Sequence, residues 1–492
     1  MSKKAIVIGS GFAGLSAASF LSKYGWDVDV VEKHDQPGGR CRHFKVDGFT
    51  FDMGPSWYWM PDVFERYFAQ FNKKVADYYK LIRLDPSYRI YWDHDAMDVP
   101  ADYEALKKLF DELEPGAGEQ LDAFMKEAEY KYRVGINKLV FKPGQSLLEF
   151  LDFELIVGLF KLDVFRDIKS HISKYFKHPQ IRQMMEFPVL FLGALPENTP
   201  ALYSLMNFAD VKLGTWFPEG GMYKIVEGMH KLATETGVKF HFNSNVSSII
   251  IENGTAKGVT IDGAEPMYAD VVIGAADYHF IETKLLESQY RSYTPAYWEK
   301  RVMAPGCLIF YVGTSCKIPS LLHHSLFFDV PFEKHANEIY SNPSWPEKPL
   351  FYLSATSKTD ASQAPADGEN LFFLMPIAAG LDGDDENIRN HYFDILCKRL
   401  EERTGIDIQK HLVYKRAYCN SDFIVDYNAF KGNAYGLANT LMQTANLKPA
   451  CKSKKVKNLY YTGQLTVPGP GVPPSLISGE VVAGLVDREL KA

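Results

Sequence analysis

The sequence predicts an α/β protein: a parallel sheet assembled from discontinuous segments, with a mixed α+β domain of antiparallel strands and helices inserted between them. Three observations predict this class. The stretch "KKAIVIGSGFAGLSAASFLSKYGWDVDVVEK" has the pattern of a strand, a glycine-rich turn, a helix and a second strand. Residues 216–276 alternate helical and strand patterns, and "NLYYTG" near the end is a short apolar strand followed by a helix. Apolar runs that alternate with helices are typical of parallel sheets covered on both faces.

Composition restricts the class of function. The 492 residues are 46% hydrophobic and 23% charged, as in an ordinary globular protein, and the formal net charge of -7 argues against nucleic acid as a partner. The six cysteines lack CxxC spacing and His323–His324 lacks partner ligands, so we predict no metal site. The cysteines fit a reducing cytoplasm, and no apolar stretch reaches the length of a membrane span. We therefore expect a cytoplasmic protein that contacts the cytoplasmic membrane only peripherally.

The first turn has the GxGxxG spacing, with glycines at Gly9, Gly11 and Gly14. The first glycine permits a tight turn, the second lets a pyrophosphate approach the backbone, and the third lets helix and strand pack closely. Glu32 ends the second strand, with Lys33 beside it. An acid at this distance accepts hydrogen bonds from a ribose hydroxyl. These residues predict a Rossmann-like dinucleotide site without choosing between NAD and FAD.

A second phosphate-handling feature follows directly. "GGR" places Gly39 and Arg40 after the ribose strand, where bare backbone and a guanidinium suit a phosphate. The hairpin-like "VDGFTF" then leads to Gly54, Pro55 and Ser56, and we expect that turn to come back toward the cofactor. The aromatic run "SWYWMP" at the same place either lines a substrate tunnel or packs in the core.

The C-terminal corner "GQLTVPGPGVPPSLISGE" is rigid and bare. Its strand would end at the carboxyl edge of the parallel sheet, where such folds bind ligands, and its helix would point its N-terminus at the same crevice. Prolines hold the corner rigid, and glycines let a flat ring lie directly on the backbone. We expect this corner to contact a flat cofactor ring through Gly463, Gln464, Gly471, Val472 and Pro473.

Together these blocks resemble the bacterial-type phytoene desaturases, the carotenoid desaturase branch of the FAD-dependent amine oxidase-like superfamily. The resemblance covers nearly the whole chain, and its most specific pieces are "VIGSGFAGLSAA", "EKHDQPGGRCR", "GFTFDMGPSWYWMP", "GTWFPEGGM" and "YYTGQLTVPGPGVPPSLISG". It implies FAD as the cofactor, an FAD-binding domain of the amine oxidase type, and Val246 at the adenine end of FAD. Gln464 stands where amine oxidases often have Glu, which counts against an amine oxidase.

The resemblance also implies domain boundaries. Residues 1–78, 216–294 and 451–492 would form the FAD-binding domain. Residues 79–215 and 295–450 would form the substrate domain, and the first of these two segments would also contact the membrane.

The implied activity is stepwise desaturation of phytoene, 15-cis or all-trans, toward lycopene by hydride transfer to the flavin. Alternatives are a desaturase of hydroxylated or C30 carotenoids, a carotene isomerase, and a flavin amine oxidase. Because no second GxGxxG occurs downstream, we expect oxygen or a quinone to receive the electrons. The expected partners are thus a hydrophobic polyene and the membrane surface. The sequence leaves open whether the protein forms a homo-oligomer.

The proton lost in desaturation needs an acceptor, or a cationic intermediate needs a stabiliser. The apolar segment Gln145–Ile168 carries spaced acids, of which Asp152 and Glu154 are the candidates for this role. The same segment also fits an amphipathic core helix with solvated acids. The sequence leaves both interpretations open.

Overall fold

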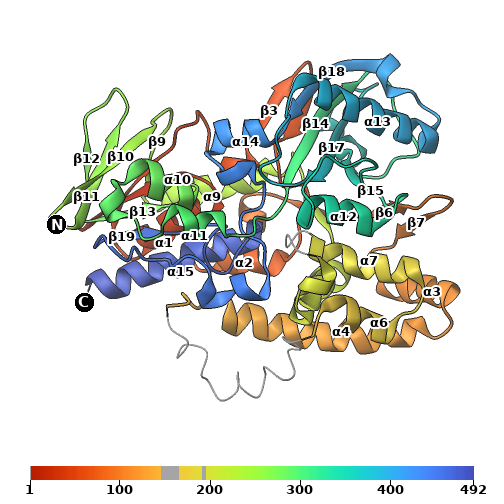
Figure 1. Cartoon of the computed structure of the whole chain (residues 1–492), viewed down its shortest axis with the longest axis horizontal. Helices are drawn as coiled ribbons and strands as arrows, with labels where there is room; N and C mark the ends of the chain where they lie inside the picture. Colours follow the sequence, from red (N-terminus) through yellow and green to blue (C-terminus); the bar gives the residue numbers. More distant parts are fainter. Residues whose placement is uncertain (1, 146–165, 191–194, 492) are drawn as a thin grey trace.

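A five-stranded parallel sheet forms one half of the protein (Figure 1). The computed structural model of the chain describes residues 2–145, 166–190 and 195–491. The strands run in the order β19-β13-β1-β2-β9, and every neighbouring pair is parallel. Their bounds are β1 (Lys4–Ile8), β2 (Asp27–Val31), β9 (Lys239–His241), β13 (Val271–Gly274) and β19 (Leu459–Tyr461). The two ends of the chain therefore meet in one sheet.

Helices cover one face of this sheet and a small antiparallel sheet covers the other. Val7 of β1 packs among the helices, whereas its neighbour Ile8 packs against the three-stranded sheet, because successive side chains of a strand point to opposite faces. The covering elements are α1 (Phe12–Lys23), α9 (Tyr223–Glu235), α15 (Val472–Lys491), β10 (Val246–Glu252), β11 (Thr255–Ile261) and β12 (Met267–Tyr268). Helices α1 and α15 lie side by side, since a Cβ at Gly479 would be 2.4 Å from the carbonyl oxygen of Ala13.

A seven-stranded sheet forms the other half, in the order β18-β14-β17-β16-β15-β6-β7. Its pairs are antiparallel except for β15 with β6, which are parallel. The strands are β6 (Tyr88–Tyr91), β7 (Ala96–Val99), β14 (Gly306–Thr314), β15 (His324–Phe327), β16 (Phe351–Ser354), β17 (Glu369–Ile377) and β18 (Leu412–Tyr418). Helix α13 (Glu386–Thr404) packs on one face, and the opposite face turns toward the parallel-sheet half.

Further helices and two small β pairs complete the described chain. The helices are α2 (Pro61–Ala69), α3 (Tyr103–Leu113), α4 (Ala117–Val134), α6 (Ile168–Tyr175), α7 (Pro179–Leu190), α8 (Leu205–Phe208), α10 (Tyr278–Phe280), α11 (Pro295–Glu299), α12 (Phe332–Tyr340) and α14 (Asn420–Tyr427). The β pairs join β3 (His43–Val46) to β4 (Phe49–Asp52), and β5 (Leu81–Arg83) to β8 (Trp216–Pro218). Within the residues that the structure describes, no helix combines the length and apolar character needed to cross a bilayer.

The predicted α/β class, with a parallel sheet built from distant segments and a second α+β region, is confirmed. The second sheet is mixed rather than purely antiparallel, because β6 joins it beside β15 in parallel. Strands of the parallel sheet come from all three segments assigned to the FAD-binding domain. The domain boundaries themselves stay a prediction.

Candidate functional site

One cavity lies at the carboxyl ends of the parallel strands and continues under the seven-stranded sheet. Its empty volume is about 2230 Å³, including the part that is open to solvent. The residues that directly follow β1, β2, β13 and β19 all line it. Open α/β sheets bind ligands at this edge because the loops between strand ends and helices leave a crevice there. The GxGxxG turn, Glu32 and the C-terminal corner thus share one space.

The conformation of the GxGxxG turn depends on the absence of side chains at its glycines. Gly9 has φ +100°, a left-handed conformation that favours glycine. A Cβ at Gly14 would lie 2.0 Å from the carbonyl oxygen of Gly9, so helix α1 can approach the turn only without a side chain there. At Gly11 an added Cβ would meet no atom within 4 Å, and no side chain caps the helix at this residue. Gly9 and Gly11 line the cavity, whereas Gly14 packs beneath it.

Glu32 is buried, with 5% of its surface exposed, and lines the cavity. Its carboxylate accepts hydrogen bonds from the backbone N–H of Ser10 at 2.8 Å, the Ser10 hydroxyl at 2.7 Å and the backbone N–H of His34 at 3.0 Å. These contacts fix the carboxylate beside the glycine turn. The ammonium of Lys33 donates to the carbonyl of Val425 at 2.8 Å, and Lys33 also lines the cavity.

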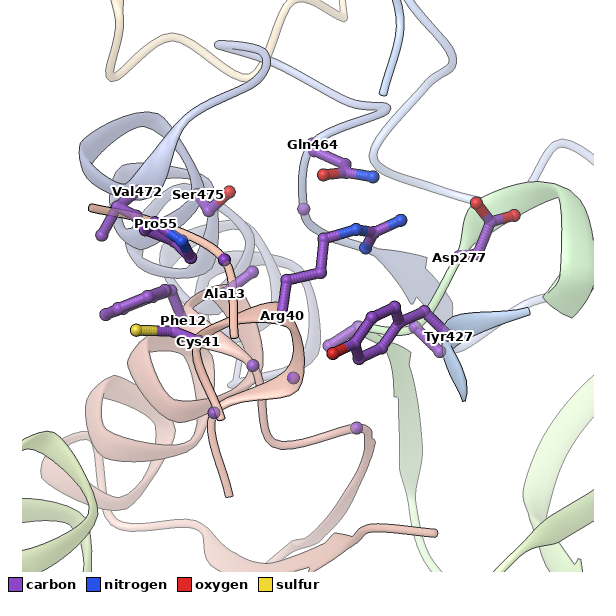
Figure 2. Close-up of a pocket in the computed structure, with 18 of the residues that line it drawn as sticks. Phe12, Ala13, Arg40, Cys41, Pro55, Asp277, Tyr427, Gln464, Val472 and Ser475 are labelled. Carbon is purple, nitrogen blue, oxygen red and sulfur yellow. The ribbon is translucent and has the colours of Figure 1, made fainter. Parts of the chain in front are cut away.

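Arg40 lies between Gln464 and Tyr427 and points toward Asp277 (Figure 2). Its Cζ is 5.2 Å from the centre of the Tyr427 ring, and an Nη donates to the carbonyl of Asn433 at 3.3 Å. With the amide of Gln464 oriented to match donors with acceptors, its oxygen accepts from Arg40 at 3.0 and 3.3 Å. Burial lowers the pKa of Arg40 and raises that of Asp277. The buried Nε of Arg40 has no hydrogen-bond partner within the described part of the chain.

The orphaned Nε and the bare turns fit a nucleotide with acceptor oxygens. A Cβ at Gly54 would lie 2.4 Å from the carbonyl oxygen of Arg40, so the loop of Gly54–Ser56 returns against Arg40. At the C-terminal corner, α15 begins at Val472 directly after Gly471, and its first turn faces the cavity. Buried polar atoms normally have partners, so an unpaired guanidinium nitrogen in this place favours a missing acceptor.

Side chains of the seven-stranded sheet form a second, apolar half of the cavity. Ile309 of β14 pairs with Leu374 of β17, which pairs in turn with Tyr352 of β16, and all three line the cavity. Cys307 lies two residues before Ile309, on the same face. The apolar half is completed by Trp57, Trp59, Met60, Met206 and Tyr435. Burial raises the pKa of the Cys307 thiol to about 12, so this thiol is uncharged at neutral pH.

The residues of the aromatic run after Gly54 divide between the cavity and the core. Trp57 and Trp59 line the cavity, whereas Tyr58 between them stacks on Phe64 with ring centres 4.6 Å apart. The Tyr58 hydroxyl lies 3.0 Å from that of Tyr79 in the core. Alternate residues therefore face the cavity and the core.

The structure brings most of the predicted site residues to this cavity. Those that line it are Gly9, Gly11, Glu32, Lys33, Gly39, Arg40, Gly54, Pro55, Ser56, Val246, Gly463, Gln464, Gly471, Val472 and Pro473. The predicted catalytic residues Asp152 and Glu154 lie outside the described residues. Among the described residues, no group of three or more His, Cys, Asp or Glu is arranged to hold a metal ion.

Several lining residues escaped the sequence analysis. Asp277 follows the end of β13, so the rule that selected Glu32 after β2 would also have selected it. Tyr427 lies at the end of helix α14, far along the chain from the glycine motifs. Tyr352 and Leu374 lie in strands that are apolar on both faces, so no pattern separates the cavity side from the core side.

Comparison with known proteins gives the family. The flavin containing amine oxidoreductase family matches residues 12–486. The carotenoid 3,4-desaturase of Haloarcula japonica is 41% identical over 479 residues, covering 97% of this chain and 96% of that protein. The zeta-carotene-forming phytoene desaturase of Myxococcus xanthus is 33% identical over 487 residues, covering 98% of this chain and 93% of that protein. Wild-type putrescine oxidase shares the fold, with a TM-score of 0.60 at 15% identity over 99% of both chains.

The chain belongs to the flavin-containing amine oxidoreductase family. It is an FAD-dependent oxidoreductase, and the resemblance to the carotenoid desaturase branch that the sequence motifs predicted is confirmed. The glycine turn, Glu32 and the orphaned Nε of Arg40 fit this cofactor. The assignment of individual residues to FAD stays a prediction.

Proposed function

We propose that the protein is a carotenoid desaturase, which removes two hydrogens from neighbouring carbons of a polyene. The observation that carries this proposal is one cavity with two unlike halves. The nucleotide half presents bare backbone, Glu32 and Arg40, and the apolar half presents one face of the seven-stranded sheet and two tryptophans. A redox cofactor and a hydrocarbon must reach the same space for desaturation, and this cavity joins the two kinds of surface.

Each half has its own part in the reaction. FAD, when bound, supplies the ring that accepts hydride. Glu32 and the glycine turn would hold its nucleotide, and the corner from Gly463 to Pro473 would hold its ring. The apolar half would exclude water and orient the polyene, gaining about 25 cal/mol for each Å² of apolar surface buried.

The distribution of charge disfavours an amine substrate. The Asp, Glu, Lys, Arg and His side chains among the described lining residues belong to the nucleotide half: Glu32, Lys33, His34, Arg40, Asp277 and Asp426. The described residues of the apolar half carry no carboxylate. An ammonium group there would lose its hydration without gaining a counter-charge, which is unfavourable. A hydrocarbon would meet no such penalty.

Two carotenoid substrates are supported to different degrees. Stepwise desaturation of phytoene toward lycopene is the first candidate, supported by the 33% identity to the Myxococcus xanthus phytoene desaturase. The second is 3,4-desaturation of a carotenoid that is already conjugated, favoured by the 41% identity to the Haloarcula japonica 3,4-desaturase. The two differ in which carbons lie beside the flavin.

We also propose that the protein works in the cytoplasm, on the surface of the cytoplasmic membrane, with a quinone or oxygen as the electron acceptor. A long polyene is held in lipid rather than water, so it must be collected there. Met442 and Leu447 support such contact, since 71% and 44% of their surfaces are exposed. Co-flotation of the protein with anionic liposomes would be expected, and its absence at low salt would refute membrane binding.

A direct assay separates the candidates. Purified protein with FAD is incubated with liposomes that contain either phytoene or lycopene, and the carotenoids are analysed by chromatography and visible absorption. New absorption bands from phytoene support the first candidate, and a longer chromophore from lycopene alone supports the second. Cis–trans change without a new double bond would instead indicate an isomerase, and hydrogen peroxide from added amines an amine oxidase.

A further inference from the structure

Tyr352, in the apolar half of the cavity, has a hydroxyl that contacts a buried histidine. Its hydroxyl is 2.6 Å from Nδ1 of His324, and 5% of its surface is exposed. The thiol of Cys307 and the hydroxyl of Tyr435 are 4.0 Å from each other. Tyr352 thus lines the cavity, and its hydroxyl contacts a nitrogen base.

His324 is completely buried and held in place by aromatic stacking. Its ring lies 4.0 Å from that of Trp57 at an angle of 14°, and it pairs across the strands with Ser354. Burial, reinforced by His323, lowers the pKa of His324 far below its usual range. The imidazole is thus neutral, and in the tautomer that carries its proton on Nε2, Nδ1 accepts a hydrogen bond from the Tyr352 hydroxyl. Its Nε2 has no hydrogen-bond partner among the residues that the structure describes.

We propose that Tyr352 and His324 form the proton relay of the desaturation, with Tyr352 as the catalytic residue that meets the polyene. This inference rests on the proposed function. The carbon that loses hydride leaves its neighbour with an acidic C–H bond. The oxygen of Tyr352 accepts that proton while its own proton passes to Nδ1 of His324. One substrate C–H bond and the old O–H bond break, and a new O–H bond and an N–H bond form.

Charge balance explains why so weak a base suffices. Loss of hydride leaves an allylic cation, whose neighbouring C–H is a far stronger acid than any protonated imidazole. The cavity gains one hydride on the cofactor and one proton on His324, so its net charge does not change. Burial, which disfavours an isolated imidazolium, also keeps His324 neutral and ready to accept before each turnover.

The test uses holoenzyme and whichever of phytoene and lycopene the unaltered protein desaturates in phosphatidylcholine liposomes. Flavin bleaching is followed anaerobically with substrate deuterated either at the carbon that loses hydride or at the carbon that loses the proton. The variants are Tyr352→Phe, His324→Gln and the double variant. Tyr392→Phe is the matched control, because this buried tyrosine of α13 lies on the opposite face of the sheet and bonds the carbonyl of Pro346.

We expect desaturation by Tyr352→Phe and by His324→Gln to fall about 100-fold or more, as for loss of a general base. The isotope effect at the proton-losing carbon should grow, and the double variant should be no slower than the slower single variant. FAD content and the control should be unchanged. Wild-type rates in both variants, or slower rates with unaltered isotope effects, would overturn the relay. An unaltered protein that desaturates neither carotenoid would overturn the proposed function and the relay together.

Discussion

The two halves of the cavity are built by different means. The nucleotide half is made of backbone at the ends of parallel strands, and its shape depends on side chains that are missing, as at Gly9 and Gly14. The apolar half is made of side chains on one face of the seven-stranded sheet, such as Ile309 and Leu374. Substitutions should therefore act differently: in the first half by collision with the backbone, in the second by changing the space left for a hydrocarbon.

The largest effect is expected where the backbone leaves no room. In Gly14→Ala the new Cβ would lie 2.0 Å from the carbonyl oxygen of Gly9, so α1 must move away from the turn. We expect a loss of more than about 3 kcal/mol of stability and no retained FAD. Thermal unfolding and flavin absorbance measure both. Gly484→Ala, at an open position of α15, should be neutral or stabilising, and an equally mild Gly14→Ala would refute this view of the turn.

The next largest effect is expected from replacing a buried lysine behind the C-terminal corner. This substitution should stabilise the fold rather than destabilise it. Lys448 is 5% exposed, and its Nζ has no hydrogen-bond partner in residues 2–145, 166–190 and 195–491. A Cβ at Gly469 would lie 3.3 Å from this Nζ. Burial lowers the pKa of Lys448 to about 7. The unfolded chain therefore binds more protons between about pH 7 and pH 10, and stability rises with pH across that window.

Lys448→Met should accordingly stabilise the apoprotein by on the order of a few kcal/mol below pH 7, and by progressively less toward pH 10. Unfolding in urea at a series of pH values measures the difference. The exposed Lys455→Met is the control and should change little. A gain that did not depend on pH would show that the charge of Lys448 is not what destabilises the fold.

The apolar half is tested by filling it. Leu374→Trp adds volume between Ile309 and Tyr352, so we expect carotenoid turnover to fall at least about tenfold while FAD binding stays the same. Turnover in liposomes and the flavin-to-protein ratio measure the two effects separately. Val413→Trp, on exposed β18 of the same sheet, should alter neither. Loss of FAD from Leu374→Trp would mean that the two halves are not independent.

The smallest effect is expected in the nucleotide half when only charge is removed. Glu32→Gln keeps an oxygen that can accept from Ser10, so we expect FAD to bind about threefold to tenfold more weakly without loss of the fold. Titration of apoprotein with FAD measures this. Asp29 lies in β2, three residues before Glu32, and its carboxylate bonds His241 outside the cavity, so Asp29→Asn is the matched control. Equal affinities of the two variants would remove Glu32 from the cofactor site.

The same difference in construction decides how far the sequence could predict the site. The turn of Gly9–Gly14 and the corner of Gly463–Pro473 are continuous stretches whose required conformations select glycine and proline, so they are visible without a structure. The apolar half draws Cys307, Tyr352 and Leu374 from three strands. Those strands are buried on both faces, so alternation does not reveal which side faces the ligand.

Neither the glycine- and proline-rich motifs nor the alternation of residues along strands predicts the proton acceptor. The acids at Asp152 and Glu154 were selected because carboxylates are common bases, and they lie outside the described residues. The pair of Tyr352 and His324 depends on strands β15 and β16 lying side by side, which no local pattern predicts. From the sequence, His323–His324 can be considered only as a pair of possible metal ligands, and it lacks further ligands nearby.

The central claim is that one cavity holds FAD and a polyene so that hydride passes directly between them. Anaerobic mixing of the holoenzyme with the carotenoid in liposomes, followed by diode-array absorption, tests it most directly. The account predicts that flavin absorbance falls and the polyene spectrum shifts to longer wavelength with the same rate constant in a single turnover. A flavin that stays oxidised while the spectrum of the polyene changes, or a reduced flavin beside an unchanged polyene, would contradict it.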